Sequence, residues 1–346
     1  MPIDITIQQY LTQFKGWPLI DVRSPGEFEK GHIPGAVNIE LFSNDERAHV
    51  GTVYKQQSQK AAIDLGYQYV NPRLQEFIDR SLAVAPDRKV VVHCWRGGMR
   101  SHAFAQHLED NGFNEIYLVE KGYKAFRRIA LNSFDNYKIN VLGGYTGSGK
   151  THILNQLTTL GEQVLDLENI AQHKGSAFGS IGYGEQPTTE QFENNLYWIW
   201  RDFDPNHPIW VEDESPNIGN VNIPQYLFQR MRSNRLLFID ISKEERARLL
   251  VKEYALDNKP KLADAIQRIS KRLGPQATKY AMEMLEEDNF YEVALITLHY
   301  YDKYYLKGLA KRDQDKIDIL KLENTDAQAN AQTILKYFQK QFYVGV

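Results

Sequence analysis

Short apolar runs alternate with amphipathic segments along the first third of the chain. The runs are rich in β-branched residues, which favour strands, whereas the segments between them repeat apolar positions at helical spacing. The expected strands cover residues 18–22, 31–39, 89–94 and 115–123, and the expected helices cover residues 71–83 and 101–112. Strands that alternate with helices predict a parallel sheet with helices on both faces.

A polar, weakly patterned stretch over residues 131–138 separates this region from a second α/β unit. That unit begins with a strand from Ile139, followed by a helix over residues 152–160. Further strands are expected over residues 208–215 and 235–241, after which the pattern is mostly helical to about residue 310. We see no internal repeat and no low-complexity tract.

A chain of 346 residues is too long for one ordinary hydrophobic core and suits two domains. We therefore expect an α/β protein with two domains. The first, residues 1–130, is a parallel sheet flanked by helices. The second, residues 138–346, is an α/β domain with a helical C-terminal part.

The composition narrows the class of protein. The formal charge of −3 gives no global positive field, so a polyanionic partner needs a local basic patch. A single cysteine excludes an internal disulfide and a cysteine-rich zinc site. The N-terminus does not resemble a secretory signal, and no apolar run approaches 18 residues. We expect a cytoplasmic protein that does not span a membrane, and the sequence gives no oligomeric state.

The single cysteine follows a strand and opens the glycine-rich loop HCWRGGMRS at residues 93–101. Backbone N–H groups from Arg96 to Arg100 can curl toward the sulfur of Cys94, because Gly97 and Gly98 tolerate a positive φ. The positive end of the following helix adds to their effect, and both favour the thiolate. The predicted catalytic residues are Cys94, Arg96, Gly97 and Arg100.

The same loop fits the pattern His-Cys-x5-Arg-Ser of cysteine-dependent phosphatases. In that chemistry Arg100 would bind phosphate as a fork while the Cys94 thiolate attacks phosphorus. A buried, inert cysteine is a third interpretation, because free cysteine often behaves as a small apolar residue. From the loop alone these interpretations stay open.

A second glycine-rich loop, GYTGSGKT at residues 144–151, matches the phosphate-binding pattern Gly-x4-Gly-Lys-Thr between a strand and a helix. Its backbone N–H groups can cradle a diphosphate, while Lys150 neutralises the outer oxygens and Thr151 holds Mg²⁺. The predicted phosphate-binding residues are Gly144, Gly147, Ser148, Gly149, Lys150 and Thr151. The acidic end of the strand PIWVEDES provides Asp213, with Glu212 or Glu214, to orient such a metal.

Longer stretches carry family resemblances. LIDVRSPGEFEKGHIPGAVNI (19–39) resembles the rhodanese family, although the arginine spacing suits a cysteine loop one residue longer than in many rhodaneses. With a phosphate-binding loop in the second half, the whole chain resembles the bacterial tRNA 2-selenouridine synthase family. The matching stretches are 19–39, HCWRGGMRS (93–101), GGYTGSGKT (143–151), LDLENIAQHKGSAFG (165–179), VEDESPNIG (211–219) and KRLG (271–274).

This resemblance implies a rhodanese-like domain fused to a P-loop NTPase-like domain, with Cys94 as the essential cysteine. It also implies a tRNA substrate carrying 2-thiouridine at the wobble position. Selenium from selenophosphate would replace the sulfur through an S-geranyl intermediate made from geranyl diphosphate. We expect no tightly bound cofactor and an enzyme that supplies selenophosphate as a partner. The sequence does not choose between a perselenide on Cys94 and attack of Cys94 on the base.

The two glycine-rich loops leave two alternatives to this selenium-transfer hypothesis open. One is a Cys-x5-Arg phosphatase fused to a P-loop NTPase. The other is a non-catalytic tRNA-binding module gated by a nucleotide.

Three further groups receive roles under this hypothesis. A polar stretch after a strand is expected to bind substrate, since strand ends line the ligand crevice of α/β sheets; its residues are Asp166, Glu168, His173 and Ser176. The aromatic segment over residues 192–203 is either a wall for a prenyl chain or, more simply, the core of a helix. Basic residues concentrated between 243 and 272 suit a tRNA backbone. The tRNA-binding candidates are Arg127, Arg128, Arg268, Lys271 and Arg272.

Overall fold

The computed structural model describes residues 1–134, 137–254 and 259–342, which form two compact units. The first unit comprises residues 1–133 and 193–198, and the second comprises residues 134–192 and 199–346. The chain passes from one unit to the other inside the stretch 131–138, of which residues 135 and 136 lie outside the described part.

The first unit is built on a five-stranded sheet in the order β1-β5-β4-β2-β3, and every pair in it is parallel. The strands are β1 (Ile3–Ile5), β2 (Leu19–Asp21), β3 (Ala36–Asn38), β4 (Lys89–His93) and β5 (Glu115–Val119). The sheet thus brings the C-terminal ends of the strands β2 and β4 side by side, with Asp21 in register with His93.

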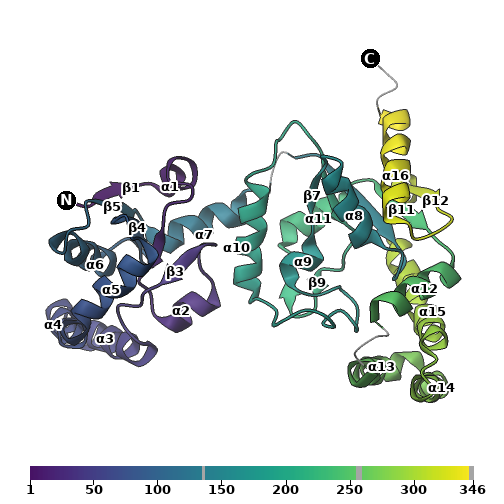
Figure 1. The fold of residues 1–346 in the computed structure, drawn as a ribbon, viewed down its shortest axis with the longest axis horizontal. Coiled ribbons are helices and arrows are strands. Elements are labelled where there is room, and N and C mark those ends of the chain that lie inside the picture. Colours follow the sequence, from purple (N-terminus) through teal and green to yellow (C-terminus); the bar gives the residue numbers. More distant parts are fainter. Residues whose placement is uncertain (135–136, 255–258, 343–346) are drawn as a thin grey trace. The chain divides into compact units, whose positions relative to one another are not determined.

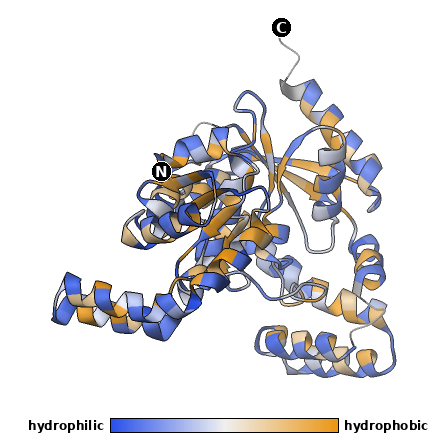
Figure 2. Cartoon of the chain, turned by 60° about the vertical axis from the view of Figure 1, so that its left-hand side comes forward, coloured by the Kyte–Doolittle hydropathy of each residue, from blue (hydrophilic) through white to orange (hydrophobic). Residues whose placement is uncertain are grey.

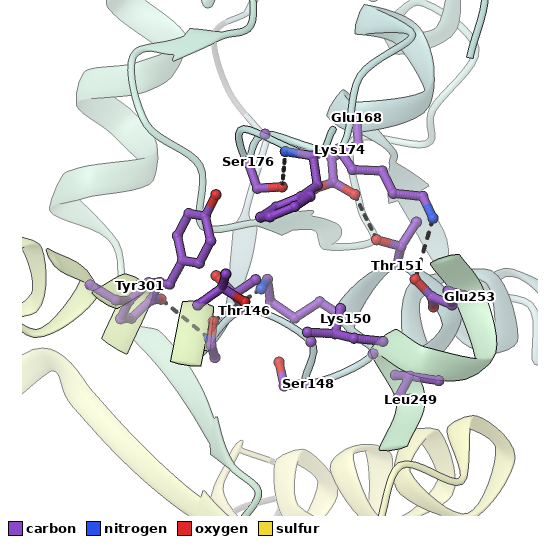
Figure 3. Close-up of a pocket in the computed structure, with 18 of the residues that line it drawn as sticks. Thr146, Ser148, Lys150, Thr151, Glu168, Lys174, Ser176, Leu249, Glu253 and Tyr301 are labelled. Atoms are coloured by element: carbon purple, nitrogen blue, oxygen red, sulfur yellow. Dashed lines mark hydrogen bonds and ion pairs between the residues drawn. The ribbon is translucent and has the colours of Figure 1, made fainter. Parts of the chain in front are cut away.

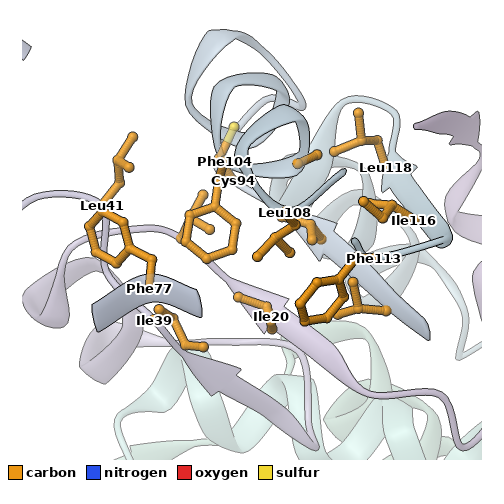
Figure 4. Close-up of a cluster of buried hydrophobic side chains, with 14 of the residues drawn as sticks. Ile20, Ile39, Leu41, Phe77, Cys94, Phe104, Leu108, Phe113, Ile116 and Leu118 are labelled. Atoms are coloured by element: carbon orange, nitrogen blue, oxygen red, sulfur yellow. The ribbon is translucent and has the colours of Figure 1, made fainter. Parts of the chain in front are cut away.

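Helices accompany the strands of this unit (Figure 1). They are α1 (Ile7–Gln13), α2 (Pro25–Lys30), α3 (Asn44–Gln56), α4 (Gln59–Val70), η1 (Asn71–Arg73), α5 (Leu74–Val84), α6 (Met99–Asp110) and α7 (Gly122–Asn132). Their apolar sides bury one cluster with the sheet, which includes Phe77, Phe104 and Ile20 (Figure 4). Cys94 belongs to this cluster, so the sulfur sits on a rigid, close-packed support.

The second unit contains another five-stranded parallel sheet, in the order β12-β11-β6-β8-β7, and a short antiparallel pair. The strands are β6 (Ile139–Gly144), β7 (Gln163–Leu165), β8 (Ile209–Glu212), β11 (Leu236–Asp240), β12 (Ile317–Lys321), and the pair β9 (Asn217–Ile218) and β10 (Val221–Asn222). The central strand β6 is the one that enters the phosphate loop.

Two kinds of helix belong to this unit. Those that accompany the sheet are α8 (Lys150–Thr159), α9 (Leu167–Ala171), α10 (Thr189–Trp200), α11 (Gln225–Ser233) and α16 (Ala327–Phe342). The first unit includes the six residues 193–198 of α10. A separate helical part consists of α12 (Lys243–Tyr254), α13 (Lys259–Leu273), α14 (Pro275–Glu286) and α15 (Phe290–Leu309), followed by η2 (Gln314–Lys316).

The predicted α/β fold with parallel sheets is confirmed, including the mostly helical region that ends near residue 310. The strands appear mostly hydrophobic and the helices two-sided in Figure 2, as sheets covered by helices require. The sequence did not predict the strands β1, β9, β10 and β12 or the helices α1, α2, α3, α4, α7, α9, α11 and α16. The strand expected over residues 115–123 ends at Val119, before α7 begins. Among the described residues, no helix combines the length and the apolar character that crossing a membrane demands.

Candidate functional site

The first candidate site surrounds Cys94, which follows β4 directly. Its side chain is 3% exposed. The Gly98 N–H donates to the sulfur at 3.3 Å, and the Ser101 hydroxyl lies 3.3 Å from the sulfur. The helix α6 begins at Met99, two residues before the expected start, so its first turn faces the sulfur. The loop is therefore curled around Cys94 as its glycines predicted.

The surroundings of Cys94 favour its charged form. Burial raises the pKa of the thiol, but the hydrogen bond to Ser101, the charge of Arg100 and the N–H groups of Gly98 and Arg96 outweigh it. The pKa of Cys94 consequently lies below its usual value. A thiolate is the nucleophilic form of cysteine, so these contacts favour the form of Cys94 that can attack.

Two glycines allow this loop to close. Gly97 has a φ of +59°, and a Cβ there would lie 2.6 Å from the carbonyl oxygen of Val119. Gly122, the first residue of α7, has a φ of +50°, and a Cβ there would collide with the carbonyl oxygen of Cys94. Gly97 was predicted from the sequence as a site residue, whereas Gly122 was not. Its sequence signal, a glycine three residues after the end of β5, is too common to identify a site residue.

Arg100 is held by a residue from a distant part of the chain. Its guanidinium forms an ion pair with Glu27 of α2 at 2.9 Å. Burial raises the pKa of Glu27, but the hydrogen bond from Arg100 outweighs this and holds the pKa below its usual value. The other predicted arginine, Arg96, has an exposed side chain, and its backbone N–H donates a hydrogen bond to the sulfur of Cys94. The role of Glu27 was missed, although the Glu-Phe pair belongs to the rhodanese-like stretch.

Behind the loop, a buried network fixes the ends of β2 and β4. Arg23 forms an ion pair with Asp21 at 2.6 Å, donates to the carbonyl of Gly31 at 2.8 Å and stacks on Tyr123 at 3.9 Å. His93 approaches Asp21 at 3.7 Å. With both charges paired and fully buried, this network supports the loop structurally.

The second candidate site is the phosphate loop between β6 and α8. Gly147 and Gly149 have φ values of +75° and +74°, which side chains other than glycine rarely adopt. The amine of Lys150 turns back and donates to the carbonyl of Gly144 at 3.0 Å. The buried hydroxyl of Ser148 has no hydrogen-bond partner within the described residues. A bound anion would satisfy both groups, as in other phosphate loops.

Three carboxylates gather beside this loop. Glu168, Glu212 and Glu214 each offer an oxygen, and these oxygens lie within 4.8 Å of one another. The Thr151 hydroxyl donates to Glu168 at 2.7 Å, and the Glu168 N–H donates to Glu212 at 2.9 Å. The second oxygen of Glu212 is buried and lacks a partner within the described part of the chain.

The three carboxylates lie so close together that they repel one another when ionised, and a cation between them would offset this repulsion. Burial, followed by the charge of Glu168, raises the pKa of Glu214 to about 8. Burial and the same neighbour raise the pKa of Glu212 well above its usual value, and burial raises that of Glu168. An all-oxygen donor set beside a phosphate loop is what Mg²⁺ prefers. Thr151, Glu168, Glu212 and Glu214 therefore fit a divalent cation.

Asp213, the acid that the sequence analysis placed first, has a different position. It pairs with Arg312 at 2.5 Å and accepts a hydrogen bond from Tyr305 at 3.0 Å. Successive side chains at a strand end point to opposite sides, so Glu212 and Glu214 face the cluster while Asp213 faces Arg312. Asp213 lines the same pocket but lies outside the group of carboxylates.

The polar stretch after β7 divides in the same way. Glu168 and Ser176 line the pocket. Asp166 instead caps α9 by accepting from the Asn169 N–H at 2.9 Å, and His173 accepts from the Gly175 N–H at 3.1 Å. These two do not line the pocket, so the structure brings only half of the predicted substrate group to it.

The pocket at the phosphate loop has a volume of about 530 Å³, and Lys150, Glu168 and Leu249 are among the residues that line it (Figure 3). The loop, Lys150 and the acids form a charged wall. The apolar part of the lining comes from α12, α13 and α15; its residues include Leu249, Leu250, Val251, Leu262, Phe290, Val293 and Ala294. The aromatic side chains Phe192, Tyr197 and Trp200 of α10 are buried and do not line this pocket, which agrees with their simpler interpretation as a helix core.

The predicted basic residues differ in how accessible they are. Arg127 pairs with Glu193 at 2.5 Å and donates to Asn194 at 2.7 Å. The other four, Arg128, Arg268, Lys271 and Arg272, are exposed. The last three share α13, on the helical part that also walls the pocket.

Comparison with known proteins agrees with this two-part construction. The model "Rhodanese-like domain" matches residues 6–129, and the model "tRNA 2-selenouridine synthase AAA domain" matches residues 137–337. The first unit is accordingly rhodanese-like, and the second is an AAA-type domain with a phosphate loop.

Curated relatives match over most of the chain. The tRNA 2-selenouridine synthase of Nitrosomonas europaea is 32% identical, over 85% of this chain and 90% of its own. That of Aeromonas salmonicida is 34% identical, over 85% of this chain and 88% of its own. Among solved structures, an N-terminal domain from Clostridium difficile 630 is 37% identical, covering 38% of this chain and 100% of that one, with a TM-score of 0.34. On the family model and these relatives, the chain belongs to the tRNA 2-selenouridine synthase family.

Proposed function

We propose that this protein is an enzyme that replaces the sulfur of wobble 2-thiouridine in tRNA with selenium. Its co-substrates would be geranyl diphosphate and selenophosphate. The observation that carries this proposal is the P-loop pocket, in which a phosphate loop and apolar side chains of the helical part line one cavity. A prenyl diphosphate has the same two halves, a doubly charged head and a hydrocarbon chain.

The first step would occur in the P-loop pocket. The loop N–H groups, the Ser148 hydroxyl and Lys150 would bind the diphosphate. Leu249, Leu250 and Leu262 would shield the geranyl chain from water, which favours binding in proportion to the apolar area buried. Thr151 and the three glutamates would hold Mg²⁺, which supplies positive charge next to a leaving diphosphate.

The chemistry of this step is an S-alkylation. The sulfur of 2-thiouridine attacks C1 of the geranyl group, the C1–O bond breaks, and diphosphate leaves with the bonding pair. The base loses its N3 proton and becomes an S-alkyl isothiourea. Lys150 would stabilise the charge that develops on the departing oxygen. The outcome turns a poor leaving group, a thiocarbonyl sulfur, into a good one.

The second step would use Cys94. Its thiolate adds to C2 of the base, and geranylthiol leaves with a proton, so the base becomes bonded to the cysteine sulfur. The selenium of selenophosphate then displaces Cys94 from C2, and water cleaves the Se–P bond to give selenouridine and phosphate. Each step is a substitution without any change of oxidation state.

A perselenide on Cys94 suits the chain less well. The selenium of selenophosphate is already fully reduced, so bonding it to a thiolate sulfur would require the removal of two electrons. The chain contains one cysteine, and therefore no second thiol to exchange with. Attack on the base needs no oxidant, which is why we favour it.

The geometry gives the phosphatase alternative less support. In that chemistry the arginine of the loop binds the phosphate oxygens as a fork. Arg100 instead forms an ion pair with Glu27 at 2.9 Å, so phosphate would have to compete with a carboxylate. The contacts that lower the pKa of Cys94 likewise favour a catalytic site over a module that only binds tRNA.

The proposal is tested with the purified protein and an anticodon stem–loop that carries 2-thiouridine. Mass spectrometry of the wobble nucleoside should show S-geranyl-2-thiouridine after addition of geranyl diphosphate and Mg²⁺. Adding selenophosphate should then give 2-selenouridine. ATP in place of geranyl diphosphate should leave the nucleoside unchanged. Phosphate release from an aryl phosphate, with no change in the nucleoside, would overturn the proposal in favour of the phosphatase.

A further inference from the structure

One aromatic side chain of α15 lies both on the surface and in the lining of the P-loop pocket. Tyr304 is 42% exposed, yet it lines the pocket that contains Lys150 and Thr151. It does not rest in the core of the helical part, whose apolar cluster is formed by other residues. Its position at the surface of a ligand pocket suggests contact with something outside the chain.

Two cations flank this ring. The guanidinium carbon of Arg272 lies 5.7 Å from the ring centroid, and the amine of Lys307 lies 5.2 Å from it. Both side chains are exposed, so their charges remain available to phosphate groups. Behind the ring, the buried Tyr300 packs at 4.8 Å and limits how far Tyr304 can fold inward. An exposed ring between cations is typical of proteins that bind single-stranded nucleic acid.

The helix α15 also ties Tyr304 to the phosphate loop. One position later, the Tyr305 hydroxyl accepts a hydrogen bond from the Gly144 N–H at 3.2 Å. Two positions earlier, Asp302 pairs with Arg246 at 2.9 Å, and Arg246 donates to the carbonyl of Thr146 at 3.0 Å. These contacts grip the helix on both sides of Tyr304, so the ring has a fixed position relative to the diphosphate-binding residues.

We propose that Tyr304 is the stacking platform for the unpaired base of the RNA substrate at the entrance of the P-loop pocket, with Arg272 and Lys307 binding the adjoining phosphates. This rests on the proposed function. Splayed anticodon bases are commonly bound by stacking on aromatic side chains. A base held there would present its sulfur to a pocket that already contains the alkylating group. Tyr304 is thus a positioning residue for the first step.

The test compares Tyr304→Ala with Tyr304→Phe, which keeps the ring. A matched control is Tyr280→Ala, because Tyr280 is 44% exposed on the neighbouring α14 but does not line the pocket. The probes are an anticodon stem–loop carrying 2-thiouridine, for RNA affinity and single-turnover geranyl transfer, and inorganic diphosphate, for affinity at the phosphate loop.

Tyr304→Ala should weaken binding of the stem–loop about ten-fold or more, as loss of one base-stacking contact does. Geranyl transfer at low RNA concentration should fall equally, while diphosphate affinity stays unchanged. Tyr304→Phe and Tyr280→Ala should match the wild type. If Tyr304→Ala binds and alkylates RNA normally, the platform is wrong; if it loses diphosphate affinity instead, Tyr304 serves the pocket and not the RNA. Failure of the wild type itself to alkylate RNA would count against the proposed function.

Discussion

The cysteine loop and the phosphate loop share one construction but have opposite electrostatics. In each, a parallel strand enters a glycine-rich turn and a helix begins at its end. Around Cys94, a hydroxyl, N–H groups and an arginine lower the pKa of the acid, so negative charge is stabilised by the chain itself. Beside the phosphate loop, burial and the neighbouring carboxylates raise the pKa values of Glu212 and Glu214, so the chain by itself does not stabilise their negative charge.

Because of this difference, the two sites require different ligands. The cysteine site is complete as a nucleophile, because its charge is satisfied by groups of the chain. The phosphate loop is complete only with ligands of both signs: an anion for its N–H groups and Lys150, and a cation for its carboxylates. Under the proposed function, the first site attacks the base, and the second binds and activates the diphosphate.

The largest expected effect follows from removing the nucleophile. Cys94→Ala should lower the rate of selenouridine formation at least about 10³-fold, as the loss of a covalent nucleophile does. Geranyl transfer should stay within about two-fold of the wild type, since it occurs at the other loop. Mass spectrometry of the nucleoside measures both products. Persistent selenouridine formation would show that Cys94 is not the nucleophile.

Removing the charge at the phosphate loop should give the opposite pattern. Lys150→Ala should slow geranyl transfer about 10²–10³-fold, in the range known for losing one group that stabilises a transition-state charge. The reactivity of Cys94 toward iodoacetamide should not change, which serves as the internal control. Single-turnover kinetics with saturating geranyl diphosphate measure the first quantity. A normal transfer rate would mean that the diphosphate is bound elsewhere.

The conformation of the cysteine loop depends on Gly122, which has no side chain to take part in the reaction. Gly122→Ala should shift the backbone at Cys94, raise the pKa of the thiol and slow its alkylation by iodoacetamide about ten-fold at neutral pH. Gly35→Ala is the matched control, because Gly35 also has a positive φ but open space around it. The rate of alkylation as a function of pH gives the thiol pKa directly. Equal effects of both changes would contradict the proposed contact.

The smallest expected effect concerns stability. The pKa of Glu214 is about 8 in the folded chain, against an ordinary value of 4.5, so the folded chain keeps this group protonated to a higher pH than the unfolded chain does. Its contribution to the free energy of unfolding is therefore fully present below pH 4.5 and is lost as the pH rises through 8. Without divalent ions, Tm should therefore fall between pH 5 and pH 8.5. Glu214→Gln should remove part of the decrease, about 2–4 °C.

Magnesium gives the complementary measurement. Mg²⁺ should raise Tm of the wild type more at pH 8.5 than at pH 5, because deprotonated glutamates bind it better. In Glu214→Gln the gain should be smaller. An equal effect of Mg²⁺ at both pH values would argue that the carboxylates do not bind the metal.

Much of the fold could be predicted because a buried strand is visible in the sequence as a short run of apolar, β-branched residues. The runs at 89–94 and 235–241 became β4 and β11 within one or two residues at each end. The edge strand β12 was missed since most of its residues are exposed or half-buried, and only its pairing with β11 defines it. The pair α3 and α4 has almost no buried residues and therefore lacks a strong apolar period.

The site was predictable as far as its loops are contiguous in sequence. Cys94, Lys150 and Thr151 could be named because each motif is local. Glu27 could not, since it lies 73 residues from Arg100 and only the fold unites them. The carboxylate cluster likewise joins Glu168 to residues 44 and 46 positions later, and which acid at the end of β8 faces it depends on the direction of each side chain.

The central claim is that the two loops perform successive, separable steps, and one measurement tests it most directly. A stem–loop that already carries S-geranyl-2-thiouridine is given, with selenophosphate, to the Lys150→Ala and Cys94→Ala proteins. The account predicts that Lys150→Ala forms selenouridine at the wild-type rate, because the step it lacks has been supplied, whereas Cys94→Ala forms none. Equal impairment of both variants on this substrate would contradict the separation of the two steps.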